Sequence, residues 1–239
     1  MFKKIFVSLS LFVVMLGLTA CGKTTKKWAV ENMAEITKEY YFGENDDVFV
    51  TLAVGEREKD YLLNGQATEL VNFSLLSLKF KEDNYARAEV VQVVSNDNKV
   101  DVEAKYNSFN DSYMVDIVDD VEIGESVSVV YEGETIVLQK QNFAVNYEKA
   151  IEIATNELKE KLDEQKSFNH FEAECYLRVM SEKDRDFGEL YWCFTCLNYE
   201  GESFSVVIST SDGKILANSL TEEGEGVAKS NSVANSNNG

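Results

Sequence analysis

The sequence predicts an α+β fold, in which an antiparallel β-sandwich-like domain is followed by a small helix-on-sheet domain. Between residues 47 and 141, apolar and polar residues alternate in short runs, which is the period of a half-buried strand. After residue 146 the apolar residues recur at helical spacing, and three strand-like runs follow. Hydrophobic residues make up 44% of the 239 residues and charged residues 27%, as in a globular protein of one large or two small domains.

Residues 1–20 have the features of a secretory signal peptide. Lys3 and Lys4 precede an apolar run over residues 5–18. That run is shorter than the roughly 20 residues of a membrane-spanning helix. A basic start, a short apolar stretch and small residues before a cleavage site are typical of a secretory leader.

The leader ends in Leu18-Thr19-Ala20-Cys21, which resembles a bacterial lipobox. The resemblance implies that Cys21 carries a diacylglyceryl group and becomes the mature N-terminus. Two or three acyl chains hold a protein stably on a membrane, where one chain is marginal. We therefore expect a lipoprotein anchored to the cell membrane and facing outside the cytoplasm. The Gram type of the host stays open.

Residues 21–44 are predicted to be a lipid-anchored linker and a short helix. Ala29, Met33, Ile36 and Tyr40 have helical spacing, which predicts a helix over residues 28–41. The β-sandwich-like domain then covers residues 45–141. Turn residues separate its strands, for example at Asn64-Gly65 and at residues 96–98, 110–111 and 132–134.

Within residues 45–141 the alternation is clearest in four runs. Apolar residues recur at every second position over residues 48–54, 100–106, 113–117 and 127–131. Several short strands at this spacing suggest a sandwich or a small barrel. One polar face per strand fits an antiparallel sheet with one wet side.

The last predicted domain covers residues 142–220 and begins with a helix. Asn146 is placed to cap it, and Ile151, Ala154, Leu158 and Leu162 form one apolar stripe. Strands are predicted over residues 171–179, 190–199 and 203–209. A turn at residues 211–214, with Gly213 supplying the positive φ, leads into a short final strand. Residues 221–239 lack aromatic residues and are predicted to be a disordered tail.

Residues 143–218 resemble a PepSY-type domain. The matching features are the helix around Ala150 and Ala154, the strands after it, and the closing stretch at residues 204–216 with Gly213 in its turn. Ser211 and Asp212 depart from the family's usual approach to that turn. The resemblance implies a small module of secreted and cell-surface proteins, some of which are thought to restrain proteases. It brings no catalytic residues.

The net charge and the histidine content argue against several classes of function. The formal net charge is −19, so the surface lacks the basic character that nucleic-acid binding needs. His170 is the only histidine, which argues against histidine metal clusters and Ser-His-Asp catalysis. We therefore predict no cofactor, no metal ion, no catalytic residue and no nucleic-acid partner.

Three cysteines other than Cys21 need an explanation. If residues 171–179 and 190–199 form a hairpin, Cys175 can face Cys193 or Cys196 and form a disulfide. The alternative is three buried thiols that act as small apolar residues. Cys193 and Cys196 also form a C-x-x-C run, but residues three apart in a strand point to opposite faces, which disfavours redox catalysis by the pair.

These features predict a non-enzymatic, membrane-anchored binding or regulatory module outside the cytoplasm, with a secreted protein or a protease as its partner. The first alternative is a solute-binding lipoprotein that serves a transporter, and the second is an enzyme of the cell envelope. An exposed edge strand or apolar patch favours protein docking. A large polar cleft favours solute binding.

Overall fold

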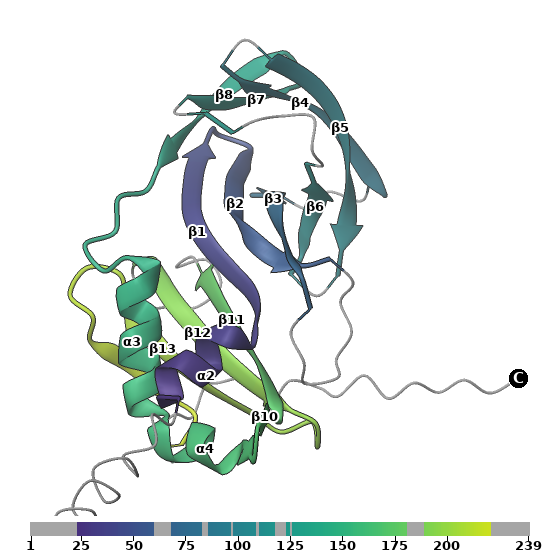
Figure 1. Cartoon of the computed structure of the whole chain (residues 1–239). Coiled ribbons are helices and arrows are strands. Elements are labelled where there is room, and N and C mark those ends of the chain that lie inside the picture. The colour runs from purple at the N-terminus through teal and green to yellow at the C-terminus, as the bar shows by residue number, and fades with distance from the viewer. Residues whose placement is uncertain are drawn as a thin grey trace, which may run out of the picture.

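The computed structural model describes residues 23–59, 68–82, 86–96, 98–108, 110–117, 123–124, 126–180 and 189–220 (Figure 1). The predicted signal peptide, the predicted lipid site Cys21, the turn at Asn64-Gly65 and the predicted tail over residues 221–239 lie outside the described residues. Among the described residues, no helix has the length and apolar character needed to cross a membrane.

The described residues form three short helices and fourteen strands. The helices are α2 (Thr25–Glu31), α3 (Tyr147–Glu157) and α4 (Lys159–Glu164). The strands of the first half are β1 (Met33–Glu44), β2 (Val48–Glu58), β3 (Leu70–Phe80), β4 (Ala88–Ser95), β5 (Asn98–Asn107), β6 (Ser112–Asp116), β7 (Val127–Tyr131) and β8 (Glu134–Lys140). Those of the second half are β9 (Lys166–Ser167), β10 (His170–Phe171), β11 (Ala173–Met180), β12 (Tyr191–Asn198), β13 (Ser203–Ser209) and β14 (Ile215–Asn218).

Twelve of the strands form one sheet, and eight of these close into an antiparallel barrel. The sheet order is β14-β13-β12-β11-β1-β2-β3-β6-β5-β4-β7-β8, and β8 pairs in turn with β1. Closure of the barrel occurs where Tyr41 and Phe42 of β1 pair with Lys140 and Gln139 of β8. The barrel forms the upper part of the molecule in Figure 1.

Apolar side chains from all eight strands fill the interior of the barrel. They sit at alternate positions, as a strand with one buried face requires. The buried members are Tyr41, Val48, Val50, Leu52, Leu76, Leu78, Val91, Val93, Ala104, Tyr113, Ile117, Val127, Val129, Ile136 and Leu138. A barrel of eight strands is about wide enough for side chains to fill it.

β1 belongs to both parts of the sheet. Its first residues pair in parallel with β11, through Met33 with Cys175 and Ile36 with Leu177. Its length pairs with β2, and its end closes the barrel. The prediction of a helix over residues 28–41 is therefore wrong: the helix ends at Glu31 and the chain continues as a strand. The three-residue spacing of Met33 and Ile36 is compatible with a helix, but a register irregularity between Met33 and Glu35 produces the same spacing in the strand.

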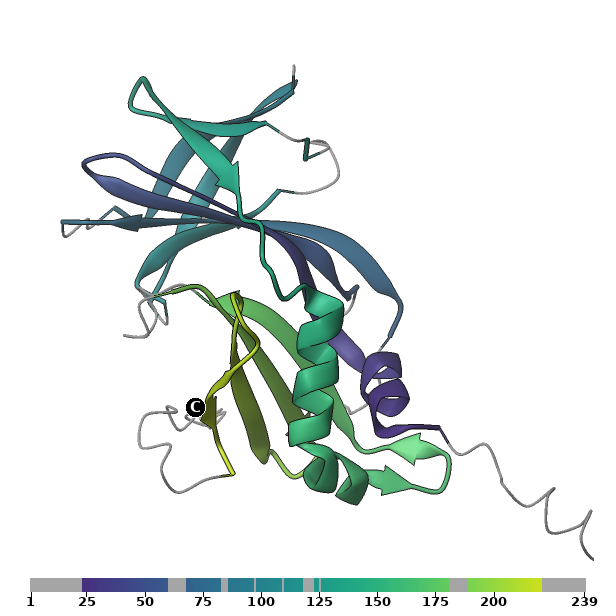
Figure 2. The ribbon, with the colours of Figure 1, turned by 90° about the vertical axis from the view of Figure 1, so that its left-hand side faces the viewer.

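The second core lies between the three helices and one face of β1 and β11–β13. Figure 2 shows α3 lying across that face. Ala150, Ile151 and Ala154 of α3 are buried against Trp192 and Phe194 of β12. As predicted, Asn146 caps α3: its side chain accepts a hydrogen bond of 2.9 Å from the backbone N–H of Lys149.

The predicted fold class, an α+β chain with a β-sandwich-like domain followed by a helix-on-sheet PepSY-like domain, is wrong. The chain is mostly β, its first strands close an eight-stranded barrel, and the described helices are three and short. Alternation of apolar residues is the same in a sandwich and in a barrel. What separates the two is the pairing of β1 with β8, between residues about a hundred positions apart, which no local pattern reveals.

Candidate functional site

The outer edge of β14 is the candidate docking site. Among the described residues, β14 has one neighbouring strand, β13, and ends the twelve-stranded sheet. Three of its four residues pair with β13, Asn218 with Val206, Ala217 with Val207 and Ile215 with Ile208, and a bulge lies between Val207 and Ile208. An edge strand presents backbone N–H and C=O groups on its outer side, and a second chain can pair with them.

Two structured segments hold β14 in place. Before it, Ser209 Oγ accepts hydrogen bonds from the backbone N–H groups of Ser211 and Asp212, at 3.2 and 3.4 Å. After it, the backbone N–H of Ser219 donates to Ser205 O at 3.0 Å. The turn residue Gly213 has a φ of +77°, as the sequence predicted for the glycine of this turn. The edge is therefore pre-formed, which lowers the entropic cost of binding.

Apolar side chains flank this edge. Ile215 is 39% exposed and Leu220 is 42% exposed. In the turn before β14, the charges of Lys214 and Asp212 offset each other, because the two side chains form an ion pair of 2.9 Å. A hydrogen bond from the backbone N–H of Lys214, together with that ion pair, lowers the pKa of Asp212. The arrangement offers backbone pairing and two apolar contacts.

Two buried glutamates, Glu58 and Glu174, lie on β2 of the barrel and on β11. Glu174 is fully buried on β11 and accepts a hydrogen bond of 2.7 Å from the hydroxyl of Tyr176. Glu58, at the end of β2, is 3% exposed. Its Oε1 accepts a hydrogen bond from the backbone N–H of Thr68, while Oε2 has no hydrogen-bond partner among the described residues. Burial raises the pKa of Glu58, the Thr68 hydrogen bond opposes that rise, and the charge of Glu174 adds to it.

Glu58→Gln is expected to stabilise the protein at pH 7. A carboxyl whose pKa is higher in the folded than in the unfolded chain stabilises the fold only while it is protonated. That contribution is lost as the pH rises from the unfolded pKa, about 4.3, through the raised folded value. Glutamine keeps an oxygen for Thr68 and carries no charge. We therefore expect the urea midpoint of E58Q to exceed that of wild type at pH 7. The difference between the two midpoints should be smaller at pH 4.5.

Glu56→Gln, two residues earlier on the same strand, is the matched control. Glu56 is about one-third exposed and forms an ion pair of 2.6 Å with Lys38. Loss of this ion pair in E56Q should leave the stability of the protein unchanged or slightly lower, as for most surface ion pairs. If E58Q lowers the midpoint at pH 7 as much as E56Q or more, the buried carboxylate is not a destabilising group.

The cysteines are divided between the two faces of the sheet. Cys175 and Cys196 lie directly opposite each other on β11 and β12, both fully buried beneath the helices. Cys193 lies opposite Arg178 and on the other face, as predicted for residues three apart in a strand. Cys193 and Cys196 therefore do not form a joint redox site.

The backbone geometry selects between the two predicted partners of Cys175. The N–H of Cys175 donates to Asn32 O at 2.9 Å and so points away from β12. Cys175 and Cys196 are therefore a non-hydrogen-bonded pair, with Cα atoms about 4.5 Å apart. That separation is within the reach of a disulfide. The described cysteines are thiols in this structure, and burial together with Cys196 raises the pKa of Cys175. A disulfide stays a prediction, with Cys196 as the partner.

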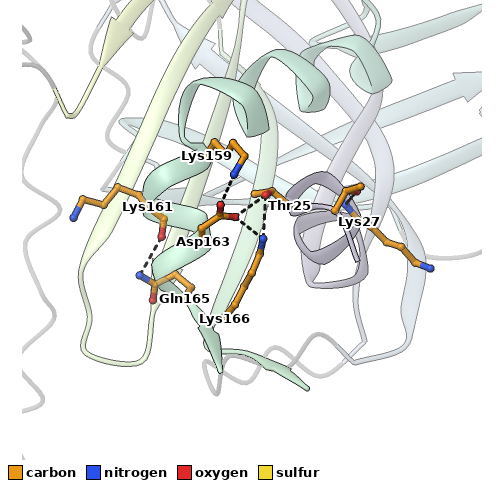
Figure 3. A network of polar contacts seen from close by, with 8 residues as sticks. Thr25, Lys27, Lys159, Lys161, Asp163, Gln165 and Lys166 are labelled. Atoms are coloured by element: carbon orange, nitrogen blue, oxygen red, sulfur yellow. Dashed lines mark hydrogen bonds and ion pairs between the residues drawn. The ribbon is translucent and has the colours of Figure 1, made fainter. Parts of the chain in front are cut away.

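The start of α2 is fastened to α4 and β9 by a polar network, shown in Figure 3. Asp163 Oδ1 accepts a hydrogen bond of 2.6 Å from the hydroxyl of Thr25. The same carboxylate forms ion pairs with Lys159 and Lys166, and Lys166 Nζ lies 3.0 Å from Thr25 Oγ1. Hydrogen bonds from these partners hold the pKa of Asp163 well below its usual range, against the opposing effect of burial. Because Thr25 and Asp163 are 138 residues apart, no local sequence pattern indicates this network.

The described residues carry no cluster of side chains of the kind that binds metal ions. No group of three or more histidine, cysteine, aspartate or glutamate side chains there could hold a metal ion. His170 lies exposed on β10. Comparison of the chain with known protein families, with curated proteins and with solved structures finds no match.

Proposed function

We propose that the chain is a membrane-anchored extracytoplasmic lipoprotein that binds a secreted protein without catalysis, by adding an extended segment of that protein to the edge of β14. The lipobox-like sequence ending at Cys21 supports the anchor. The single observation that supports the docking mode is that β14 ends the sheet with one strand beside it among the described residues. In strand addition, backbone hydrogen bonds give affinity and side-chain contacts give specificity.

The exposed side chains indicate what kind of segment would fit. Ile215 and Leu220 favour an extended segment with apolar residues that can cover them. The formal net charge of −19 favours basic residues elsewhere on the partner, because opposite charge speeds association.

A photo-reactive amino acid at Leu216 is expected to capture the partner on intact cells. The matched position is Val137 on β8, which is 60% exposed on the barrel. Ile215→Lys places a charge on the edge and should reduce capture at Leu216 about tenfold, which corresponds to 1.4 kcal/mol. Val137→Lys should leave capture at Leu216 unchanged. Mass spectrometry of the cross-linked peptide should identify an extended apolar segment.

Two outcomes contradict the docking mode. One is equal capture of the same protein from Leu216 and Val137, because contact would then not be specific to the edge. The other is capture from Leu216 that I215K does not reduce. Capture of transporter subunits in place of a secreted protein would instead favour solute delivery.

A further inference from the structure

A two-residue turn between β9 and β10 presents one fully exposed aromatic ring. Phe168 lies in this turn and is 102% exposed. Its φ is +48°, a left-handed conformation that a bulky residue adopts at a cost. Asparagine or glycine would suit this turn better. The fold therefore gains nothing from a phenylalanine here, and exposed apolar residues of this kind mark contacts with other surfaces.

Direct contacts join this hairpin to the start of the described chain. The ring of Phe171 on β10 stacks on Trp28 of α2, with ring centroids 6.3 Å apart. Lys23 Nζ lies 4.4 Å from the centroid of the Trp28 ring. The network around Asp163 adds a second connection, from Lys166 of β9 to Thr25 of α2. The hairpin and the start of α2 are thus fixed to each other.

Lys23 is two residues from the predicted lipid site, Cys21. Two residues of chain span at most about 7 Å. An acyl group on Cys21 therefore holds this end of the molecule against the bilayer. Figure 2 shows the start of α2 and the hairpin on the same side of the molecule, with the barrel at the upper end.

The outer face of α2 has a charge that suits a bilayer. Residues 23–31 contain three lysines and one glutamate, in a chain with 42 acidic and 23 basic residues. Thr25 and Ala29 face the protein core, which leaves Lys26, Lys27, Val30 and Glu31 exposed. Lys27 forms an ion pair of 3.9 Å with Glu31, and Lys26 one of 3.7 Å with Glu152. Lysines near a bilayer are attracted to anionic headgroups, while a strongly acidic surface is repelled.

We infer that the tip of the β9–β10 hairpin and the exposed face of α2 form a membrane-contacting surface, in which the Phe168 ring enters the headgroup region of the bilayer that holds the chain. The inference rests on the proposed lipid anchor. An exposed phenylalanine with lysines near it is typical of segments that lie at a lipid interface. With this surface on the bilayer, anchor, hairpin and α2 contact lipid together, and the acidic remainder faces water.

The test measures how deeply position 168 lies in vesicles that carry the lipidated full chain. Phe168→Trp adds an indole at the tip, and Val90→Trp adds one at a position of the barrel that is 63% exposed. Each protein is placed in vesicles of phosphatidylcholine and phosphatidylglycerol, with or without bromine on the acyl chains. Wild-type emission, from Trp28 and Trp192, is subtracted. We expect brominated lipid to quench the added tryptophan of F168W and to leave that of V90W unchanged.

Flotation of the vesicles separates failure of the inference from failure of the anchor. If the protein floats with the vesicles and F168W is not quenched, the hairpin does not contact lipid although the anchor stands. Equal quenching of F168W and V90W also overturns the inference, since the molecule then has no fixed orientation. If the protein does not float, the anchor fails and the inference falls with it. A urea midpoint for F168W equal to that of wild type confirms that the fold is intact.

Discussion

Gly55→Ala is expected to destabilise the protein by about 4 kcal/mol or more, which places it among the most damaging single substitutions. Gly55 lies on β2 opposite Thr37, next to the bulge of β1 between Thr37 and Glu39. A Cβ atom at position 55 would lie 1.9 Å from the carbonyl oxygen of Ile36. That oxygen belongs to the backbone, so no side-chain rotation can relieve the clash. Either β1 or β2 must move, although both are strands of the barrel.

Equilibrium unfolding in urea, followed by far-UV circular dichroism, measures the effect. Gly201→Ala is the control, because Gly201 has a φ of +81° and a Cβ atom added there would meet open space. There only the strain of the left-handed conformation applies, which costs about 1 kcal/mol. A loss in G55A no larger than in G201A would show that the bulge in β1 can shift without cost.

Trp192→Ala is expected to cost about 3–5 kcal/mol, the range for removing a large buried aromatic side chain. Trp192 is fully buried and packs edge-on against Phe143, with ring centroids 5.1 Å apart. Its indole N–H donates a buried hydrogen bond of 2.7 Å to the carbonyl oxygen of Val145. Val145 directly precedes Asn146, the N-cap of α3, so Trp192 also fixes where that helix begins.

Trp192→Phe separates packing from the hydrogen bond. Phenylalanine keeps an aromatic ring but leaves the Val145 carbonyl without its donor, which costs about 1–3 kcal/mol. Urea unfolding should therefore rank the variants wild type, W192F and W192A in falling stability. Equal stability of W192F and wild type would show that the carbonyl finds another donor, such as water.

The local elements were largely predictable, and the reasons are visible in particular residues. Strand β13 occupies the predicted residues, because its apolar run ends in clear turn residues on both sides. The α3 cap at Asn146 followed from the preference of asparagine for that position. In contrast, the prediction of a helix over β1 is wrong, because a register irregularity between Met33 and Glu35 imitates helical spacing.

The arrangement of those elements was not predictable from one sequence. The barrel depends on β8 returning to β1, and the second core depends on β11 lying parallel to β1. The candidate site has the same origin, because whether β14 is an edge strand depends on its neighbours and not on its own residues. Phe168 was not predicted to be a contact residue, although an aromatic residue between the polar residues Ser167 and Asn169 is a signal in the sequence.

The shared strand β1 also determines the order in which the protein can fold. Its contacts with β2 are local, since Glu44 pairs with Phe49. Its contacts with β11 are among the most distant, since Glu35 and Arg178 are 143 residues apart. Closing so long a loop carries a large entropic cost and slows folding. During synthesis Met33 and Ile36 therefore stay without their β11 partners until residues 173–180 have been made, which is about three-quarters of the chain.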